Sequence, residues 1–192
     1  MDPAENSLPR AGITFNLGDE DRQALASYGS FDFLPADKVL IKQGQAHGRL
    51  FCVVGGRFEA RREFDGSHLL LGSIEPGEWI GEVDIFSPST AICSVVSAEP
   101  SRYWTITRER FEEFINDQKD AAIVLLIGLA STLGTRIRGI TEQLAVQVKG
   151  AKAGVQAPED PRAYDEDIRS ASDLAAAFLR QRDEERLKKR GV

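Results

Sequence analysis

Alternation of apolar and polar residues dominates the middle of this 192-residue sequence. Between residues 39 and 106, short runs rich in Val, Ile, Leu and Phe are separated by turn residues, which is the pattern of a β-sandwich or small barrel. Gly55-Gly56 and Asp65-Gly66 supply the positive φ angles that tight hairpins require. The predicted strands span residues 39–41, 50–54, 58–64, 68–74, 92–96 and 103–106.

Helical patterns flank these strands. A short helix is predicted to begin at Gly18 or Asp19 and to run through Ala26, and another begins near Arg108. A much longer helix is predicted over residues 117–148, where apolar residues repeat at spacings of 3 and 4. That heptad pattern is typical of a coiled coil, whereas a helix packed only on its own domain drifts toward a period of 3.6. The predicted dimer seam consists of Ile123, Leu126, Ala130, Leu133, Ile137, Ile140 and Leu144.

The last part of the chain reads as a linker and a charged helix. Residues 149–162 contain Gly and Pro with few apolar anchors, and residues 163–192 are predicted to form the helix. Its apolar patch of Leu174, Phe178 and Leu179 has the size with which an amphipathic helix enters a groove. We therefore predict that these three residues bind a partner. The sequence leaves open whether the groove belongs to the same chain, to a second protomer or to a different protein.

Composition and charge limit the classes of protein to which this chain could belong. A formal net charge of −6 argues against non-specific binding to nucleic acid or to an anionic membrane. The N-terminus shows no signal peptide, and the most apolar run, residues 121–130, is about half the length of a bilayer span. Cys52 and Cys93 are predicted to be reduced core residues, and His47 and His68 are isolated from any metal-ligand spacing. These features predict a cytoplasmic protein without a metal site.

One stretch carries a recognisable motif. Residues 76–98 read PGEWIGEVDIFSPSTAICSVVSA, in which Gly81-Glu82 opens a helical turn whose backbone amides are suited to an anion. This stretch resembles the phosphate-binding cassette of the cyclic-nucleotide-binding domain family, which includes the catabolite activator protein and regulatory subunits of protein kinases. The resemblance covers about residues 15–148. It implies a β-roll over residues 15–116, after an N-terminal tail of residues 1–14, and a dimer formed by the long helix.

The resemblance also implies that this chain lacks the phosphate-binding arginine of the family. In the family, the Glu of the Gly-Glu pair binds the ribose hydroxyl, and an Arg about ten residues later pairs with the cyclic phosphate. Gly81 and Glu82 match, but Ile92 stands at the Arg position, and Asp84 adds a carboxylate expected to repel a phosphate. Burying the phosphate charge without a partner costs several kcal/mol. The remaining candidate ligand residues of this degenerate pocket are Gly81, Glu82, Ser94 and Arg136, the last at the position where the family contacts the base.

The predicted fold class is mainly β with flanking helices, a jelly-roll-like β-roll followed by a dimerisation helix and an extra C-terminal helix. The predicted function is a non-enzymatic regulatory or scaffold homodimer that acts through an unidentified protein partner, without a cofactor and without direct nucleic-acid or membrane binding. No catalytic set of residues is recognisable. The first alternative is a sensor that binds a cyclic mono- or dinucleotide unconventionally. The second is a transcription regulator working through another DNA-binding subunit, because residues 149–192 are too few for the winged helix-turn-helix domain of the family.

Overall fold

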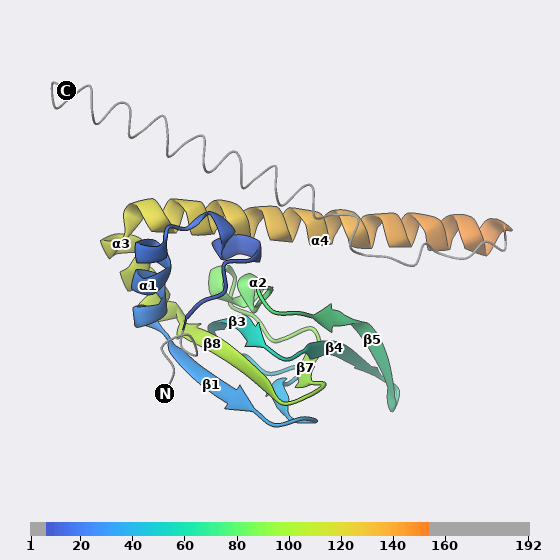
Figure 1. The fold of residues 1–192 in the computed structure, drawn as a ribbon. Coiled ribbons are helices and arrows are strands. Elements are labelled where there is room, and N and C mark those ends of the chain that lie inside the picture. Colours follow the sequence, from blue (N-terminus) through green and yellow to red (C-terminus); the bar gives the residue numbers. More distant parts are fainter. Residues whose placement is uncertain (1–6, 154–192) are drawn as a thin grey trace, which may run out of the picture. The chain divides into compact units, whose positions relative to one another are not determined.

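The computed structural model describes residues 7–153, and of residues 143–144 and 146–153 it describes the helical backbone alone. The strands form two antiparallel sheets, with orders β1-β8-β3-β6 and β2-β7-β4-β5 (Figure 1). In chain order the elements are η2 (Gly12–Asn16), α1 (Asp19–Tyr28), β1 (Ser30–Leu34), β2 (Val39–Ile41), β3 (Arg49–Gly55), β4 (Phe58–Phe64), β5 (Ser67–Ile74), β6 (Trp79–Ile80), α2 (Glu82–Phe86), β7 (Ser94–Ser97), β8 (Ser101–Thr107), α3 (Arg108–Asp117) and α4 (Lys119–Ala153).

The hydrophobic core takes side chains from both sheets. Every strand except β1 contributes a buried residue to one cluster, so each sheet buries one face against the other, as alternation along a strand requires. This arrangement confirms the predicted β-roll with flanking helices. The cluster consists of Ile41, Phe51, Val53, Phe58, Ile74, Ile80, Val95 and Tyr103.

The helices α1 and α3 lie side by side at one end of the sheets (Figure 1). Trp104 of β8 is fully buried, and its indole Nε1 donates a hydrogen bond to the carbonyl of Ala26, 3.1 Å away. Its ring contacts that of Trp79 edge to face, with centroids 5.9 Å apart. Tyr28 contacts Phe114 in the same manner at 5.5 Å. The Trp104 hydrogen bond therefore joins α1 to the first sheet, and the Tyr28–Phe114 contact joins α1 to α3.

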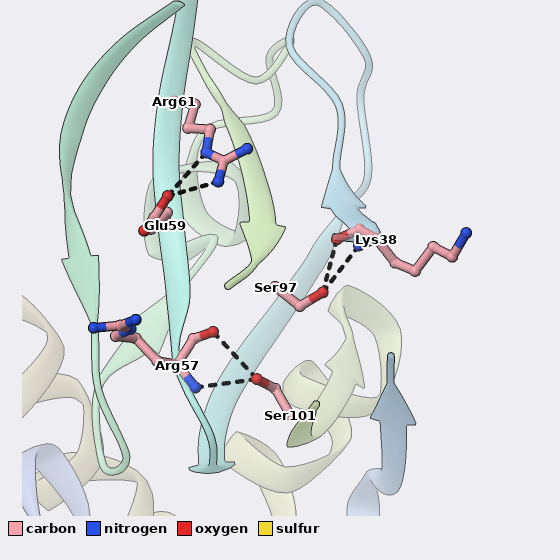
Figure 2. Close-up of polar contacts among 6 residues, drawn as sticks. All are labelled: Lys38, Arg57, Glu59, Arg61, Ser97 and Ser101. Atoms are coloured by element: carbon pink, nitrogen blue, oxygen red, sulfur yellow. Dashed lines mark hydrogen bonds and ion pairs between the residues drawn. The ribbon is translucent and has the colours of Figure 1, made fainter. Parts of the chain in front are cut away.

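Two buried serines join strand ends to neighbouring turns. The Ser97 hydroxyl accepts a hydrogen bond from the Lys38 amide at 3.0 Å and lies 3.1 Å from the Lys38 carbonyl (Figure 2). The Ser101 hydroxyl accepts from the Arg57 amide at 3.0 Å in the same way (Figure 2). Both serines are fully buried, so their hydroxyls have no access to water and are satisfied by these backbone groups.

We expect Ser97→Ala to lower the free energy of unfolding by about 1–3 kcal/mol, because the substitution removes the acceptor of the Lys38 amide and the hydroxyl that lies against the Pro35 and Lys38 carbonyls. Ser67→Ala, at an exposed position of the β4–β5 hairpin, is the matched control and should change it by less than about 0.5 kcal/mol. Urea denaturation followed by tryptophan fluorescence measures both values. Equal stability of the two variants would show that water replaces the Ser97 hydroxyl.

The structure corrects several predicted boundaries. Strands β1 and β6 were not predicted, and the strand expected from residue 92 begins at Ser94. Leu8 and Ile13 are buried and η2 begins at Gly12, so part of the predicted N-terminal tail of residues 1–14 packs against the protein. Helix α4 continues to Ala153, which makes residues 149–153 of the predicted linker helical. The predicted partner-binding residues Leu174, Phe178 and Leu179 lie outside the described residues.

The chain divides into two compact units, residues 1–123 and 124–192. Most of α4 belongs to the second unit. Within α4, Lys119–Glu142 is long and apolar enough to cross a membrane by length and composition alone, a test that a core helix of a soluble protein also passes. The sequence prediction counted only the unbroken apolar run of residues 121–130 and therefore underestimated the length of this apolar stretch.

Candidate functional site

The Gly-Glu motif forms the junction between β6 and α2. Gly81 has φ 88° and ψ 11°, a left-handed conformation that only glycine adopts readily, and it caps the start of α2. A Cβ atom at this position would lie 2.3 Å from the carbonyl oxygen of Arg49 and 2.9 Å from Cε1 of His47. Position 81 therefore requires glycine for both conformation and space. Glu82 follows as the first residue of α2 and is buried, and it stays a predicted ligand residue.

His47 forms a histidine–carboxylate pair with Asp84 of α2. His47 Nε2 lies 2.7 Å from Asp84 Oδ2, and the two side chains are only 14% and 8% exposed. His47 Nδ1 accepts a hydrogen bond from the Arg49 amide at 3.2 Å, which leaves Nε2 to face the carboxylate. The distance between His47 Nε2 and Asp84 Oδ2 is that of an ion pair. The two groups are not aligned as a hydrogen bond. Ser89 Oγ donates to Asp84 Oδ1 at 3.3 Å.

This pair corrects two sequence-based expectations. His47 is not isolated, and Asp84 is held by a partner within the protein. Arg108 at the start of α3 also donates a hydrogen bond, to the backbone carbonyl of Asp84. The sequence carries no local signal for these contacts, because residues 47, 84 and 108 come from three separate elements. The single hint is that Asp84 lies between apolar residues in the segment EVDIF.

Ile92 stands in the loop between α2 and β7, and its side chain is 71% exposed. Position 92 therefore presents an apolar side chain to solvent where the resembled family has its phosphate-binding arginine. Val83 and Phe86 of α2 are exposed as well. The outer surface of this cassette is thus apolar at three positions, a surface that does not compensate the charge of a bound phosphate.

The remaining candidate ligand residues lie in different environments. Ser94 begins β7, and its hydroxyl accepts a hydrogen bond from the Gln43 amide at 2.9 Å, which leaves its own hydrogen available for donation. Arg136 lies on α4 and is exposed. Their roles in binding a ligand stay predictions.

Neither cysteine forms a disulfide. Cys52 of β3 is fully buried, and burial raises the pKa of its thiol far above the usual range, so it behaves as a core residue as predicted. Cys93 is half-buried and precedes β7 rather than lying in a strand, which corrects the sequence-based placement. Within residues 7–153, no cluster of three or more His, Cys, Asp or Glu is arranged to hold a metal ion.

Residues 31–118 match the model of the cyclic nucleotide-binding domain family. The matched region begins in β1 and ends after α3, so it includes both sheets and the Gly81-Glu82 junction. The match and the β-roll assign residues 31–118 to a cyclic nucleotide-binding domain. A comparison with curated proteins found none that matches this chain.

Solved structures with the same fold come from several kinds of regulator. The catabolite activator protein of Thermus thermophilus is 18% identical with a TM-score of 0.65, over 90% of this chain and 88% of that protein. The N-terminal domain of a transcriptional regulator from Streptomyces coelicolor A3(2) is 24% identical with a TM-score of 0.59, over 66% of this chain and 91% of that domain. At these identities the likeness shows the fold.

A third similar structure bears on the missing arginine. It is the regulatory subunit of a cAMP-independent protein kinase A from Trypanosoma brucei, in a form with three substitutions, one of them threonine to arginine, bound to cAMP in its A site. It is 19% identical with a TM-score of 0.53, over 62% of this chain and 43% of that protein.

Proposed function

We propose that this protein is a non-enzymatic, cytoplasmic regulatory or scaffold homodimer whose nucleotide pocket is degenerate and which acts through protein–protein interaction. The observation that carries the proposal is the exposed Ile92 at the position of the phosphate-binding arginine. A cyclic nucleotide would bring a full negative charge to a cassette that supplies no cation at that position.

The buried carboxylates strengthen this argument. Glu82 and Asp84 are both buried within the five-residue helix α2, so the cassette already contains two acidic groups. Asp84 lies against His47, so Glu82 is the carboxylate that would repel an anion bound beside it. Arg108 donates a hydrogen bond from its guanidinium to the Asp84 carbonyl.

The exposure pattern along α4 supports dimerisation. Ile137 and Ile140 are 64% and 58% exposed in the single chain, whereas Leu125 and Leu129 are fully buried. The predicted seam is therefore a face of the helix that the chain's own fold leaves accessible at its two isoleucines. Ile123, Leu126 and Leu133 are half-buried, Ala130 is exposed, and Leu144 lies within the helical range of α4. A second copy covering this face would bury apolar surface at about 25 cal/mol per Å².

The second candidate function is a sensor that binds a cyclic mono- or dinucleotide in an unconventional way. The left-handed Gly81 and the buried Glu82 favour it, because the ribose-binding half of the motif is present. Ser94 and Arg136 would complete the set. A transcription regulator acting through another DNA-binding subunit is a third candidate, prompted by the similarity to the Streptomyces and Thermus regulators.

We expect isothermal titration calorimetry to show no tight binding of cyclic AMP, cyclic GMP or cyclic di-GMP to the full chain, with any dissociation constant weaker than about 1 mM. The physical reason is the absent counter-charge at position 92. A dissociation constant in the low micromolar range for any of the three would contradict the proposal and establish the sensor function.

Ile92→Arg is the complementary variant, because the exposed position accepts a longer side chain without displacing core residues. The variant should bind cyclic AMP at least about tenfold more tightly than the natural chain, the equivalent of about 1.4 kcal/mol. Ile92→Gln is the matched control, since it adds length and polarity without charge and should bring no gain. The arginine-substituted form of the Trypanosoma subunit bound to cAMP is the precedent for this design.

A further inference from the structure

The strand β5 forms an open edge of its sheet. It is the outermost strand in the order β2-β7-β4-β5, so one side of its backbone has no neighbouring strand within the described residues (Figure 1). The N–H and C=O groups along such an edge can pair with another strand. Leu69, Leu70 and Leu71 in the middle of β5 are 54%, 54% and 48% exposed. We call residues 67–71 the β5 edge.

The other edge strands carry features that block such pairing. β1 has Asp32 at its centre, and β2 has only three residues, with Lys38 and Lys42 directly before and after it. β6 has two residues, and both are buried. Charges and very short strands are means by which proteins keep their sheet edges from pairing. β5 has eight residues, and none of them is Asp, Glu, Lys, Arg or Pro. Among the edge strands within residues 7–153, β5 is therefore the least protected.

The exposed leucines of β5 point to both faces of the sheet. Leu69 lies opposite Arg62 of β4, and Leu70 lies opposite Arg61. Because opposed residues share a face and neighbouring residues alternate, Leu69 and Leu70 lie on opposite faces. A helix packed on one face would leave the leucine of the other face exposed. An added strand contributes side chains to both faces and also supplies partners for the edge backbone, so this surface suits a strand.

We propose that β5 pairs with β5 of a second copy of this chain, in antiparallel orientation and about a two-fold axis. The inference goes beyond the proposed function, because that function places the homodimer contact at the seam of α4. Pairing at β5 joins two four-stranded sheets into one continuous sheet. Copies that use both contacts form assemblies larger than a dimer.

A two-fold contact needs a surface that is complementary to itself. The β5 edge meets this condition, because the donors and acceptors along an antiparallel strand edge match those of an identical edge that runs the other way. A two-fold axis at Leu69 places Leu69 opposite its counterpart and His68 opposite the counterpart of Leu70. Leucine then meets leucine at the centre, and no like charges are opposed. The remaining edges, being charged or very short, offer no equally suitable strand.

A bulge in β5 limits the length of this contact. The pairing of β4 with β5 shifts register between Ala60 and Arg61, and Leu71 has no partner in β4. A bulge bends its strand and restrains edge pairing, so the regular part of the β5 edge is residues 67–70. A contact of this length is a small interface, for which we expect a dissociation constant on the order of 100 μM. Pairing at β5 therefore responds to the local concentration of the protein.

Sedimentation velocity of the full chain tests the proposal in the Ile137→Glu background, which removes the α4 seam. The weight-average mass should rise at least about 1.5-fold between about 5 and about 500 μM. Leu70→Lys should abolish this rise, because a lysine on an edge strand opposes pairing. Leu70 is half exposed, so the variant is expected to fold, which circular dichroism checks. Val39→Lys is the matched control, since Val39 is exposed on β2, the opposite edge strand of the same sheet, and it should leave the rise unchanged.

Hydrogen–deuterium exchange in the same background locates the contact. Amides of residues 67–70 should exchange about threefold more slowly at about 500 μM than at about 5 μM, whereas those of residues 39–41 should exchange equally at both. A mass that stays constant up to about 500 μM, or one that Leu70→Lys and Val39→Lys lower equally, would overturn the proposal. So would a rise in mass without slower exchange at residues 67–70, because the copies would then meet at another surface. The mass of the natural chain at about 5 μM reports separately on the proposed α4 dimer, because the β5 edge is mostly unpaired at that concentration.

Discussion

Replacing Trp104 with alanine is expected to lower the free energy of unfolding by about 3–5 kcal/mol. The indole is fully buried, contacts the ring of Trp79 and donates its hydrogen bond to the Ala26 carbonyl. Its removal therefore creates a cavity, disrupts an aromatic pair and removes one of the two hydrogen bonds that the Ala26 carbonyl accepts. Urea denaturation followed by circular dichroism measures the change.

Phe33→Ala is the matched control for this prediction. This substitution also removes an aromatic ring, in this case from β1, the strand that pairs with β8. The Phe33 side chain, unlike that of Trp104, is exposed. We expect a change of less than about 0.5 kcal/mol. If Trp104→Ala were no less stable than Phe33→Ala, the surrounding side chains would have closed the cavity and the attachment of α1 would not depend on Trp104.

Ile137→Glu is expected to convert the proposed homodimer into a monomer. The substitution places an unpaired carboxylate in the seam of each protomer, and burying it on association costs about 3–5 kcal/mol per site. Ile137 is 64% exposed in the single chain, so the glutamate stays solvated in the monomer and the fold should be retained. Light scattering coupled to size exclusion gives the mass, and circular dichroism gives the fold.

Arg138→Glu controls for the added charge. It introduces the same acid one position away, outside the heptad repeat and at an exposed site. This variant should remain a dimer at micromolar concentration. A folded Ile137→Glu variant that scattered as a dimer would assign the interface to a different surface, and a natural chain that scattered as a monomer would remove homodimerisation from the proposed function.

The predictions for Trp104, Ile137 and Ile92 address separate parts of the protein. Trp104 concerns the packing of α1 on the sheets, Ile137 the assembly, and Ile92 the chemistry of the cassette. Success of the first two with tight cyclic nucleotide binding would describe a conventional dimeric sensor with an unconventional pocket. Success of all three would leave the protein surface as the place where regulation acts.

Several features of this protein follow from its sequence alone. The strand β4 was predicted with the observed bounds, because the alternation of residues 58–64 and the turn Asp65-Gly66 are local signals, and both turn residues have the positive φ expected. The motif Gly81-Glu82 and the apolar Ile92 could be read directly, because the family match depends on residues close together in the chain. The apolar spacing of α4 predicted its length to within a few residues.

Other features depend on residues that meet only after folding. The short strands β1 and β6 have weak patterns of their own and exist because β8 and β3 supply their hydrogen-bond partners. His47 and Asp84 look like an isolated histidine and a repulsive carboxylate until the loop before β3 and the helix α2 bring them within 2.7 Å. Phe64 belongs by pattern to the core face, yet it is half exposed, because alternation fixes the side of a strand and only the extent of the opposing sheet decides whether that side is covered.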